Sequence, residues 1–131
     1  MKKKHNKKIL LIVEDEEILV KILSEKLISE GFQIICAKDG NEGLKIALEK
    51  HPDLILLDLL MPNCDGITML KELRNDAWGS RASVIVLTNV ATQGKIMGIE
   101  KDSSSDMFTF LVKTDWSLDN LLVKIKERLK I

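Results

Sequence analysis

Five short apolar runs alternate with stretches of helical periodicity along this chain, and this alternation limits the fold more than any other feature. Most residues in these runs are apolar, and Ile9–Val13 is continuously so, which is typical of strands buried on both faces of a parallel sheet. Parallel neighbours need a crossover connection, usually a helix. The sequence therefore predicts an α/β fold in which helices cover both faces of a five-stranded parallel sheet. The predicted strands are Ile9–Val13, Phe32–Ala37, Leu54–Leu57, Val84–Leu87 and Phe108–Val112.

The helices between these strands are predicted from apolar residues that recur three or four positions apart. Gly31 is a natural stop for the first helix, and the segment 94–101 gives only a weak fourth helix. The apolar positions of the other four are Ile18, Leu19, Ile22, Leu23 and Leu27; Leu44, Ala47 and Leu48; Ile67, Leu70 and Leu73; and Leu118, Leu121, Leu122, Ile125 and Leu129.

Length and charge restrict the function classes. With 131 residues, of which 45% are hydrophobic, the chain suits one compact domain, predicted at 9–131. Its 20 basic and 20 acidic residues cancel, which gives no electrostatic reason to expect direct binding to nucleic acid or membranes. Residues 1–8, MKKKHNKK, are predicted to be a flexible basic arm, and contact with an acidic surface is the alternative. No secretory signal or membrane span is recognised, so we expect a cytoplasmic protein.

Cysteine and histidine give little sign of metal chemistry. Cys36 and Cys64 fit neither a zinc motif nor a disulfide framework, and we expect free thiols in a reducing compartment. His51, before Pro52, is interpreted as a loop residue. Trp78 and Trp116 are each expected to anchor the loop in which they lie, although exposed tryptophans can also mark an interface.

Polar residues stand at the carboxyl ends of four predicted strands: Glu14 and Asp15, Asp58, Thr88 and Lys113. Any one of them alone could simply cap the following helix. In open parallel sheets, however, ligands bind beyond the carboxyl ends of the strands. The combination therefore predicts a functional site at one rim of the sheet.

The residue types at this rim indicate phosphoryl chemistry. Three neighbouring carboxylates repel one another unless a cation is present, and an all-oxygen ligand set selects Mg²⁺ or Mn²⁺. Thr88 and Lys113 could supply a hydroxyl and a fixed positive charge to phosphoryl oxygens. Neither a GxxxxGK[ST] loop nor a GxGxxG motif is present. We therefore expect the phosphoryl group on a protein side chain, with a carboxylate as nucleophile.

Four motifs, in order, resemble the receiver domain of two-component response regulators over residues 9–130. The resemblance implies a doubly wound, flavodoxin-like (βα)5 fold with strand order 2-1-3-4-5. It also implies a phosphorylation-dependent signalling switch that carries out phosphotransfer and autodephosphorylation and is not a conventional enzyme. The motifs are VEDEE at Val13–Glu17, LLDLLMPNCDG at Leu56–Gly66, LT at Leu87–Thr88 and FLVK at Phe110–Lys113.

The same resemblance implies a role for each residue of the phosphorylation and metal site. Asp58 resembles the phosphoacceptor. Asp15 resembles the direct ligand of Mg²⁺ or Mn²⁺, and Glu14 an acidic neighbour that acts largely through water. Leu60 would give its backbone carbonyl to the ion.

It further implies the switch and its partners. Thr88 resembles the switch hydroxyl, Lys113 the lysine that pairs with the phosphoryl group, and Phe110 the aromatic residue that turns inward. The phosphoryl group would come from a histidine kinase or a phosphotransfer protein. The face made by the fourth helix, fifth strand and fifth helix would control a downstream protein or an output domain outside this chain. We expect a monomer or a weak dimer.

Several positions depart from the family pattern. Thr114 stands where proline is usual, and Asn89 where a small residue is usual. Leu60 and Val90 offer no polar group to orient an attacking water, which predicts slow self-dephosphorylation. The segment between Thr88 and Phe110 is a few residues longer than usual and is atypical over 94–107, so the pattern does not define the length and register of the fourth helix.

Two other functions stay open. A metal-dependent phosphatase with an aspartate nucleophile would need an acid two residues after Asp58, where Leu60 stands. A binding module that has lost phosphorylation would be expected to lack an acidic residue at the rim, and none is lost.

Overall fold

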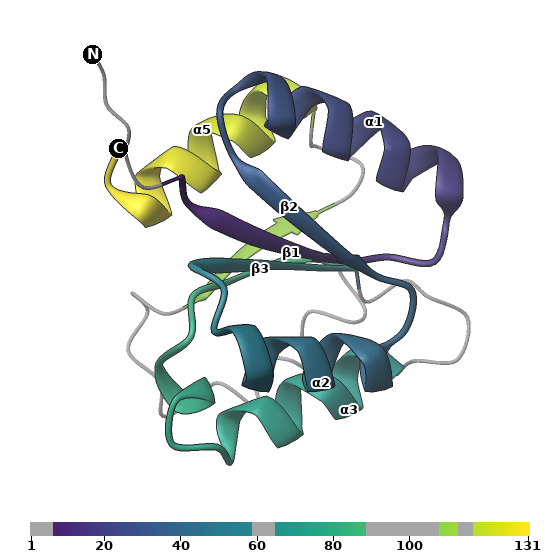
Figure 1. The fold of residues 1–131 in the computed structure, drawn as a ribbon, viewed down its shortest axis with the longest axis vertical. Coiled ribbons are helices and arrows are strands. Elements are labelled where there is room, and N and C mark those ends of the chain that lie inside the picture. Colours follow the sequence, from purple (N-terminus) through teal and green to yellow (C-terminus); the bar gives the residue numbers. More distant parts are fainter. Residues whose placement is uncertain (1–6, 59–64, 89–107, 113–116) are drawn as a thin grey trace.

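The computed structural model describes residues 7–58, 65–88, 108–112 and 117–131. Its strands form one five-stranded parallel sheet in the order β2-β1-β3-β4-β5, which confirms the predicted doubly wound topology. Figure 1 views this sheet with β2 nearest the reader. The strands are β1 Ile9–Val13, β2 Gln33–Ala37, β3 Leu54–Asp58, β4 Val84–Thr88 and β5 Phe108–Val112.

The predicted strand ends differ from the observed ones by one residue. β2 starts at Gln33, because the N–H of Phe32 donates to the carbonyl of Leu27 and so belongs to the turn that ends the preceding helix. β3 and β4 extend to Asp58 and Thr88, so these polar residues belong to the strands themselves. Asp58 and Thr88 thus stand on the sheet itself, whereas Glu14 follows β1.

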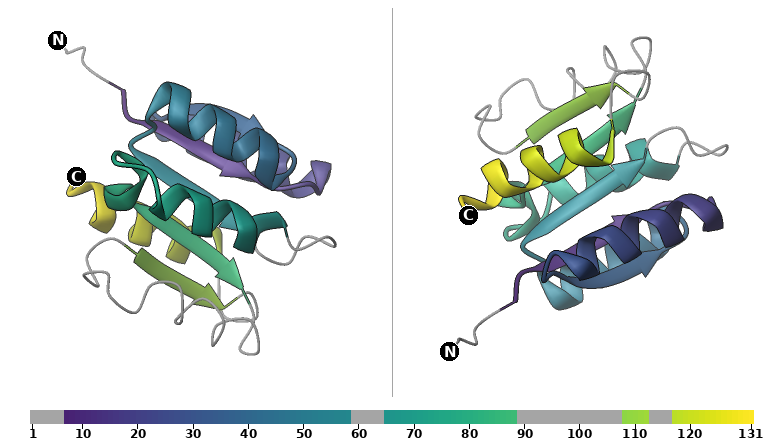
Figure 2. Two further views of the ribbon diagram at one scale, coloured as in Figure 1. Left: turned by 90° about the horizontal axis from the view of Figure 1, so that it is seen from below. Right: turned by 90° about the horizontal axis from the view of Figure 1, so that it is seen from above.

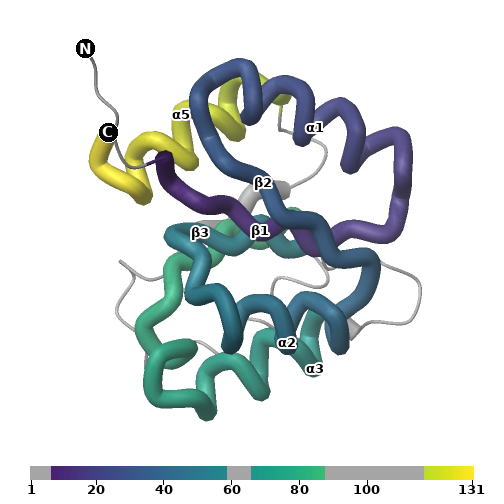
Figure 3. Tube along the Cα trace, in the orientation of Figure 1, coloured from purple at the N-terminus to yellow at the C-terminus, as the bar shows by residue number. Residues whose placement is uncertain are grey.

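Helices cover both faces of the sheet, as Figures 2 and 3 show. α1 and α5 pack on one face, and α2 and α3 pack on the other. Successive residues of β1 alternate between the two cores, with Leu11 and Val13 on the α2–α3 side and Leu10 and Ile12 on the α1–α5 side. The bounds are α1 Glu17–Ser29, α2 Gly40–Lys50, α3 Asp65–Arg74, a short 3₁₀ helix η1 Gly79–Arg81, and α5 Leu118–Leu129.

Only part of the apolar pattern in α1 reaches the core. Leu23 and Leu27 are buried, and Leu19 packs against the same cluster. Ile18 and Ile22 lie on the outer face, 74% and 45% exposed. The predicted helix is confirmed, and its extra isoleucines are surface residues.

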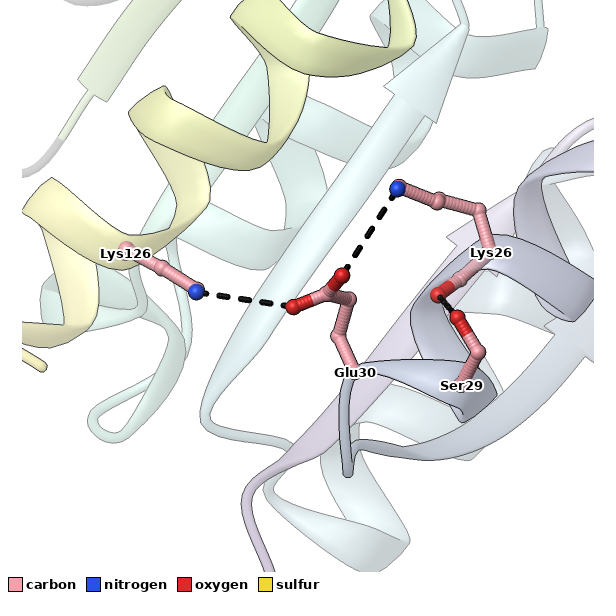
Figure 4. A network of polar contacts seen from close by, with 4 residues as sticks. All are labelled: Lys26, Ser29, Glu30 and Lys126. Atoms are coloured by element: carbon pink, nitrogen blue, oxygen red, sulfur yellow. Dashed lines mark hydrogen bonds and ion pairs between the residues drawn. The ribbon is translucent and has the colours of Figure 1, made fainter.

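Ion pairs join α1 to α5 at the amino-terminal end of the sheet. Glu30, directly after α1, accepts Lys26 at 3.6 Å and Lys126 of α5 at 3.5 Å (Figure 4). In the same turn, the hydroxyl of Ser29 donates to the carbonyl of Lys26 at 2.6 Å. Exposed pairs of this kind stabilise by about 1 kcal/mol or less, so burial supplies most of the packing between these helices.

Trp78 anchors the loop after α3, as predicted. It is half-buried against the α2–α3 core, and its ring stacks on His51, with 4.3 Å between centroids and 7° between planes. His51 ends α2 with a left-handed backbone at φ 48°, which fits its interpretation as a loop residue. The stack ties the end of α2 to the approach to β4.

No helix among these described segments is long and apolar enough to cross a membrane. Several predictions fall outside the described residues: those on 1–6, Leu60, Cys64, Asn89, Val90, 94–107, Lys113, Thr114 and Trp116.

Candidate functional site

Glu14 follows β1 and has its carboxylate inside the protein. Its backbone N–H continues the sheet ladder by donating to the carbonyl of Ala37 at 2.9 Å. One carboxylate oxygen, Oε2, accepts the N–H of Glu16 at 3.0 Å, and the residue is only 3% exposed. Glu14 therefore holds the turn from β1 into α1 while it presents a buried negative charge at the rim.

Asp58 occupies the last position of β3, where all five residues are buried. The pairing of Val13 with Leu57 puts the next residues, Glu14 and Asp58, level with each other on neighbouring strands. Asp58 is also 3% exposed, and these two are the buried charged side chains in the part of the chain that the structure describes. The strand order thus brings two carboxylates together at low solvent exposure.

Asp15 belongs to the same corner but is exposed. Glu14 and Asp15 line an open cavity of about 350 Å³. Its other walls come from the first turns of α1, the end of β2 and the start of α2, including Lys21 and Lys38. Glu14 and Asp15 can therefore be reached from solvent through this cavity.

The registers of β4 and β5 bring the remaining predicted positions to the same rim. Asp58 pairs with Leu87, so Thr88 lies one residue further along β4. Thr88 in turn pairs with Val112, the residue before Lys113. Phe110 lies within β5, paired with Val86. The backbone thus places four strand ends in the predicted order, with Lys113 itself and Leu60 outside the described residues.

Gly43 supports this corner, and the sequence analysis did not identify it. A Cβ at this position of α2 would lie 2.8 Å from Val13 Cγ2 and 3.0 Å from Met69 Sδ. Val13 directly precedes Glu14, so the close approach of α2 positions the end of β1. In the sequence, Gly43 directly precedes Leu44, the first apolar position of the predicted second helix, and a glycine within a helix costs stability unless packing requires it.

The donor set at the rim fits a hard divalent cation. Within the described segments, no three His, Cys, Asp or Glu side chains are gathered closely enough to hold a metal ion. Glu14 and Asp58 nevertheless offer oxygen ligands side by side, and Mg²⁺ commonly uses one or two carboxylates and retains several waters.

Comparison with known proteins decides the family. The sequence matches the response regulator receiver domain family over residues 10–126. The chain belongs to this family.

Curated relatives contain the receiver as part of longer proteins. The response regulator PleD of Caulobacter vibrioides is 35% identical over 96 residues, which cover 72% of this chain and 21% of PleD. The alkaline phosphatase synthesis transcriptional regulatory protein PhoP of Bacillus subtilis is 49% identical over 69 residues, or 53% of this chain and 28% of PhoP. This receiver chain therefore spans less than a third of the length of either relative.

Solved structures share the receiver fold over nearly the whole chain. The receiver domain of the Pseudomonas aeruginosa sensor histidine kinase PA1611, which has a magnesium ion in its active site cleft, superposes with a TM-score of 0.78 at 24% identity. The match covers 96% of this chain and 100% of that one. The receiver domain of the Francisella response regulator 1452 gives a TM-score of 0.77 at 26% identity, over 94% of this chain and 97% of that one.

Proposed function

We propose that this receiver takes a phosphoryl group on Asp58 from a histidine kinase or a phosphotransfer protein. The observation that carries the proposal is the burial of Asp58 beside Glu14, at the level where four strands of the sheet end. A carboxylate held in this way has few rotamers to explore and meets an incoming phosphorus atom in one orientation.

In the proposed transfer, one oxygen of Asp58 attacks the phosphorus atom of a phosphohistidine. The new oxygen–phosphorus bond forms an acyl phosphate as the nitrogen–phosphorus bond of the donor breaks. The electron pair of that bond returns to the imidazole, which takes up a proton. Autodephosphorylation replaces the protein oxygen with a water oxygen and restores the carboxylate.

Glu14, Asp58 and the exposed Asp15 are the side chains proposed to hold Mg²⁺ or Mn²⁺, together with the backbone carbonyl of Leu60. The PA1611 receiver, with magnesium in its cleft, supports the choice of ion. When bound, the cation would neutralise the carboxylates and the phosphoryl oxygens. The division in which Asp15 binds directly and Glu14 acts through water stays a prediction.

We assign the response to Thr88, Lys113 and Phe110. The hydroxyl of Thr88 and the ammonium of Lys113 would bind phosphoryl oxygens, and Phe110 would fill the space that Thr88 leaves. A ligand shifts a conformational equilibrium only by its differential affinity, and a nearly complete switch needs roughly 5 kcal/mol. A few charge-assisted hydrogen bonds, at about 1.5–3 kcal/mol each, are sufficient. The face made by the fourth helix, β5 and α5 would control a downstream protein or an output domain.

Incubation with Mg²⁺ and acetyl phosphate, followed by intact-protein mass spectrometry, tests the assignment. Wild type should gain the mass of one phosphoryl group, and Asp58→Asn should gain none. Asp53→Asn is the matched control, because Asp53 lies at the opposite end of β3 and its carboxylate accepts the N–H of Ile9. No gain in wild type would favour the module that has lost phosphorylation, and a gain in Asp58→Asn would place the acceptor elsewhere.

A further inference from the structure

The outer edge of β2 is an open end of the sheet. β2 is the first strand in the order and pairs only with β1 among the strands that the structure describes. In Figure 1 this edge faces the reader, with α1 above it and α2 below it, and no labelled element crosses in front.

Hydrogen bonding shows which backbone groups point outward. The N–H of Gln33 donates to the carbonyl of Lys8, and the carbonyl of Ala37 accepts from Glu14, so the odd-numbered residues of β2 face β1. The N–H and C=O groups of Ile34 and Cys36 therefore point away from the sheet. No hydrogen bond to these groups occurs among the described residues.

On either side of this segment, the outward N–H groups already have hydrogen-bond acceptors within the chain. The N–H of Phe32 donates to Leu27, and the N–H of Lys38 donates to Glu42 Oε1 at 2.9 Å. The open edge thus consists of two donors and two acceptors, placed symmetrically about Ile35.

The side chains of β2 do not protect this edge. Edge strands usually carry lysine, proline or a bulge that prevents pairing with another chain. The sequence QIICA contains no charged residue and no proline, and its pairing with β1 is regular. Cys36 is exposed, and Ile34 and Ile35 are half-buried.

We propose that this edge pairs antiparallel with the same edge of a second copy of the chain, with Ile34 opposite Cys36 of that copy. Opposed residues of this type exchange both of their hydrogen bonds. In this register, every outward donor and acceptor of both copies is used. Centring the pairing on Cys36 instead would bring Ile34 opposite Lys38, whose N–H already has a partner.

The charge balance favours a second copy over a charged partner. The open edge is neutral, and the 20 basic and 20 acidic residues cancel, so two copies carry no net repulsion. The pairing is two-fold symmetric, as most homodimer interfaces are. Antiparallel strands would direct the two phosphoacceptor rims to opposite ends of one continuous sheet, and dimerisation would not depend on Asp58.

Disulfide trapping tests the register. In a Cys64→Ser background, Ile34→Cys would oppose the native Cys36 of the second copy at a Cα separation of about 5.5 Å, within the range a disulfide can bridge. We expect a covalent dimer under mild oxidation. Gln33→Cys is the matched control, because its side chain is on the other face of the strand and opposes Ala37, so it should stay monomeric. Equal cross-linking of both variants, or of neither, would overturn the register.

Light scattering over a wide range of protein concentration tests the association itself. Wild type and Asp58→Asn should dimerise equally, whereas Cys36→Lys should be monomeric and retain its circular dichroism spectrum. Ile22→Lys, also at an exposed position but on α1, should behave as wild type. A wild type that stays monomeric at the highest concentration refutes the interface. Because phosphorylation is assayed separately at Asp58, this result would leave the proposed function intact.

Discussion

Asp58→Asn should make the metal-free protein more stable. Asp58 and Glu14 are level on neighbouring strands and are both buried. Neighbouring strands are about 4.8 Å apart, and two like charges at about 5 Å repel by roughly 3 kcal/mol at an effective dielectric constant of about 20. Asparagine keeps the shape and removes one charge. Allowing for residual solvent screening, we expect a net gain of about 1–2 kcal/mol in the free energy of unfolding.

Urea titration followed by circular dichroism measures this gain, first in EDTA and then in excess Mg²⁺. In EDTA the Asp58→Asn midpoint should be higher, with an unchanged slope, and the melting temperature should rise by roughly 3–8 °C. Mg²⁺ should stabilise wild type, since a ligand that binds only the folded state adds RT ln(1 + [L]/Kd). The same ion should stabilise the variant much less.

Asp53→Asn again provides the comparison. Its carboxylate is exposed and accepts a backbone N–H at 2.8 Å, so its neutralisation should slightly lower stability in both buffers. If Asp58→Asn were no more stable than wild type in EDTA, repulsion between the two buried carboxylates would not be a significant cost. The two buried carboxylates would then give no electrostatic reason to expect a cation.

Three further predictions concern the packing that supports the site, the stack of Trp78 on His51, and the lifetime of the phosphorylated protein. Gly43→Ala should lower the free energy of unfolding by about 1 kcal/mol in urea titration, because the new Cβ would press on Val13. The cost of overpacking, about 1–3 kcal/mol, exceeds the gain in helix propensity, about 1 kcal/mol. A more stable variant would contradict the close packing. Trp78→Ala should cost about 2 kcal/mol and His51→Ala about 1 kcal/mol, with less than additive loss in the double variant if the stack couples them. Leu60→Asn should shorten the lifetime of the phosphorylated protein, measured by phosphate release, and an unchanged lifetime would show that this side chain does not limit access of water.

The sequence predicted the sheet well because the central strands β1, β3 and β4 are buried on both faces and are therefore nearly continuous apolar runs. It also placed Asp58 correctly at the rim, since the end of an apolar run marks the end of a strand. It could not show that Ile18 and Ile22 face solvent, because an apolar stripe wider than the contact with the sheet has the same periodicity as one that is fully buried. Nor could it show that Glu14 is buried while Asp15 is exposed, since two adjacent carboxylates differ only in the direction that the turn into α1 gives them.

The complete burial of β3 has a consequence for how a signal could leave the site. β3 lies in the middle of the sheet between β1 and β4, and all five of its residues are buried. Amide protons in such a strand exchange with solvent chiefly through opening of the whole domain. The backbone of β3 is thus expected to stay in place when Asp58 is modified, and its movement would not transmit the change. The response must come from segments with lower local stability around it, where exchange rates should change when Asp58 is modified while those of β3 stay slow.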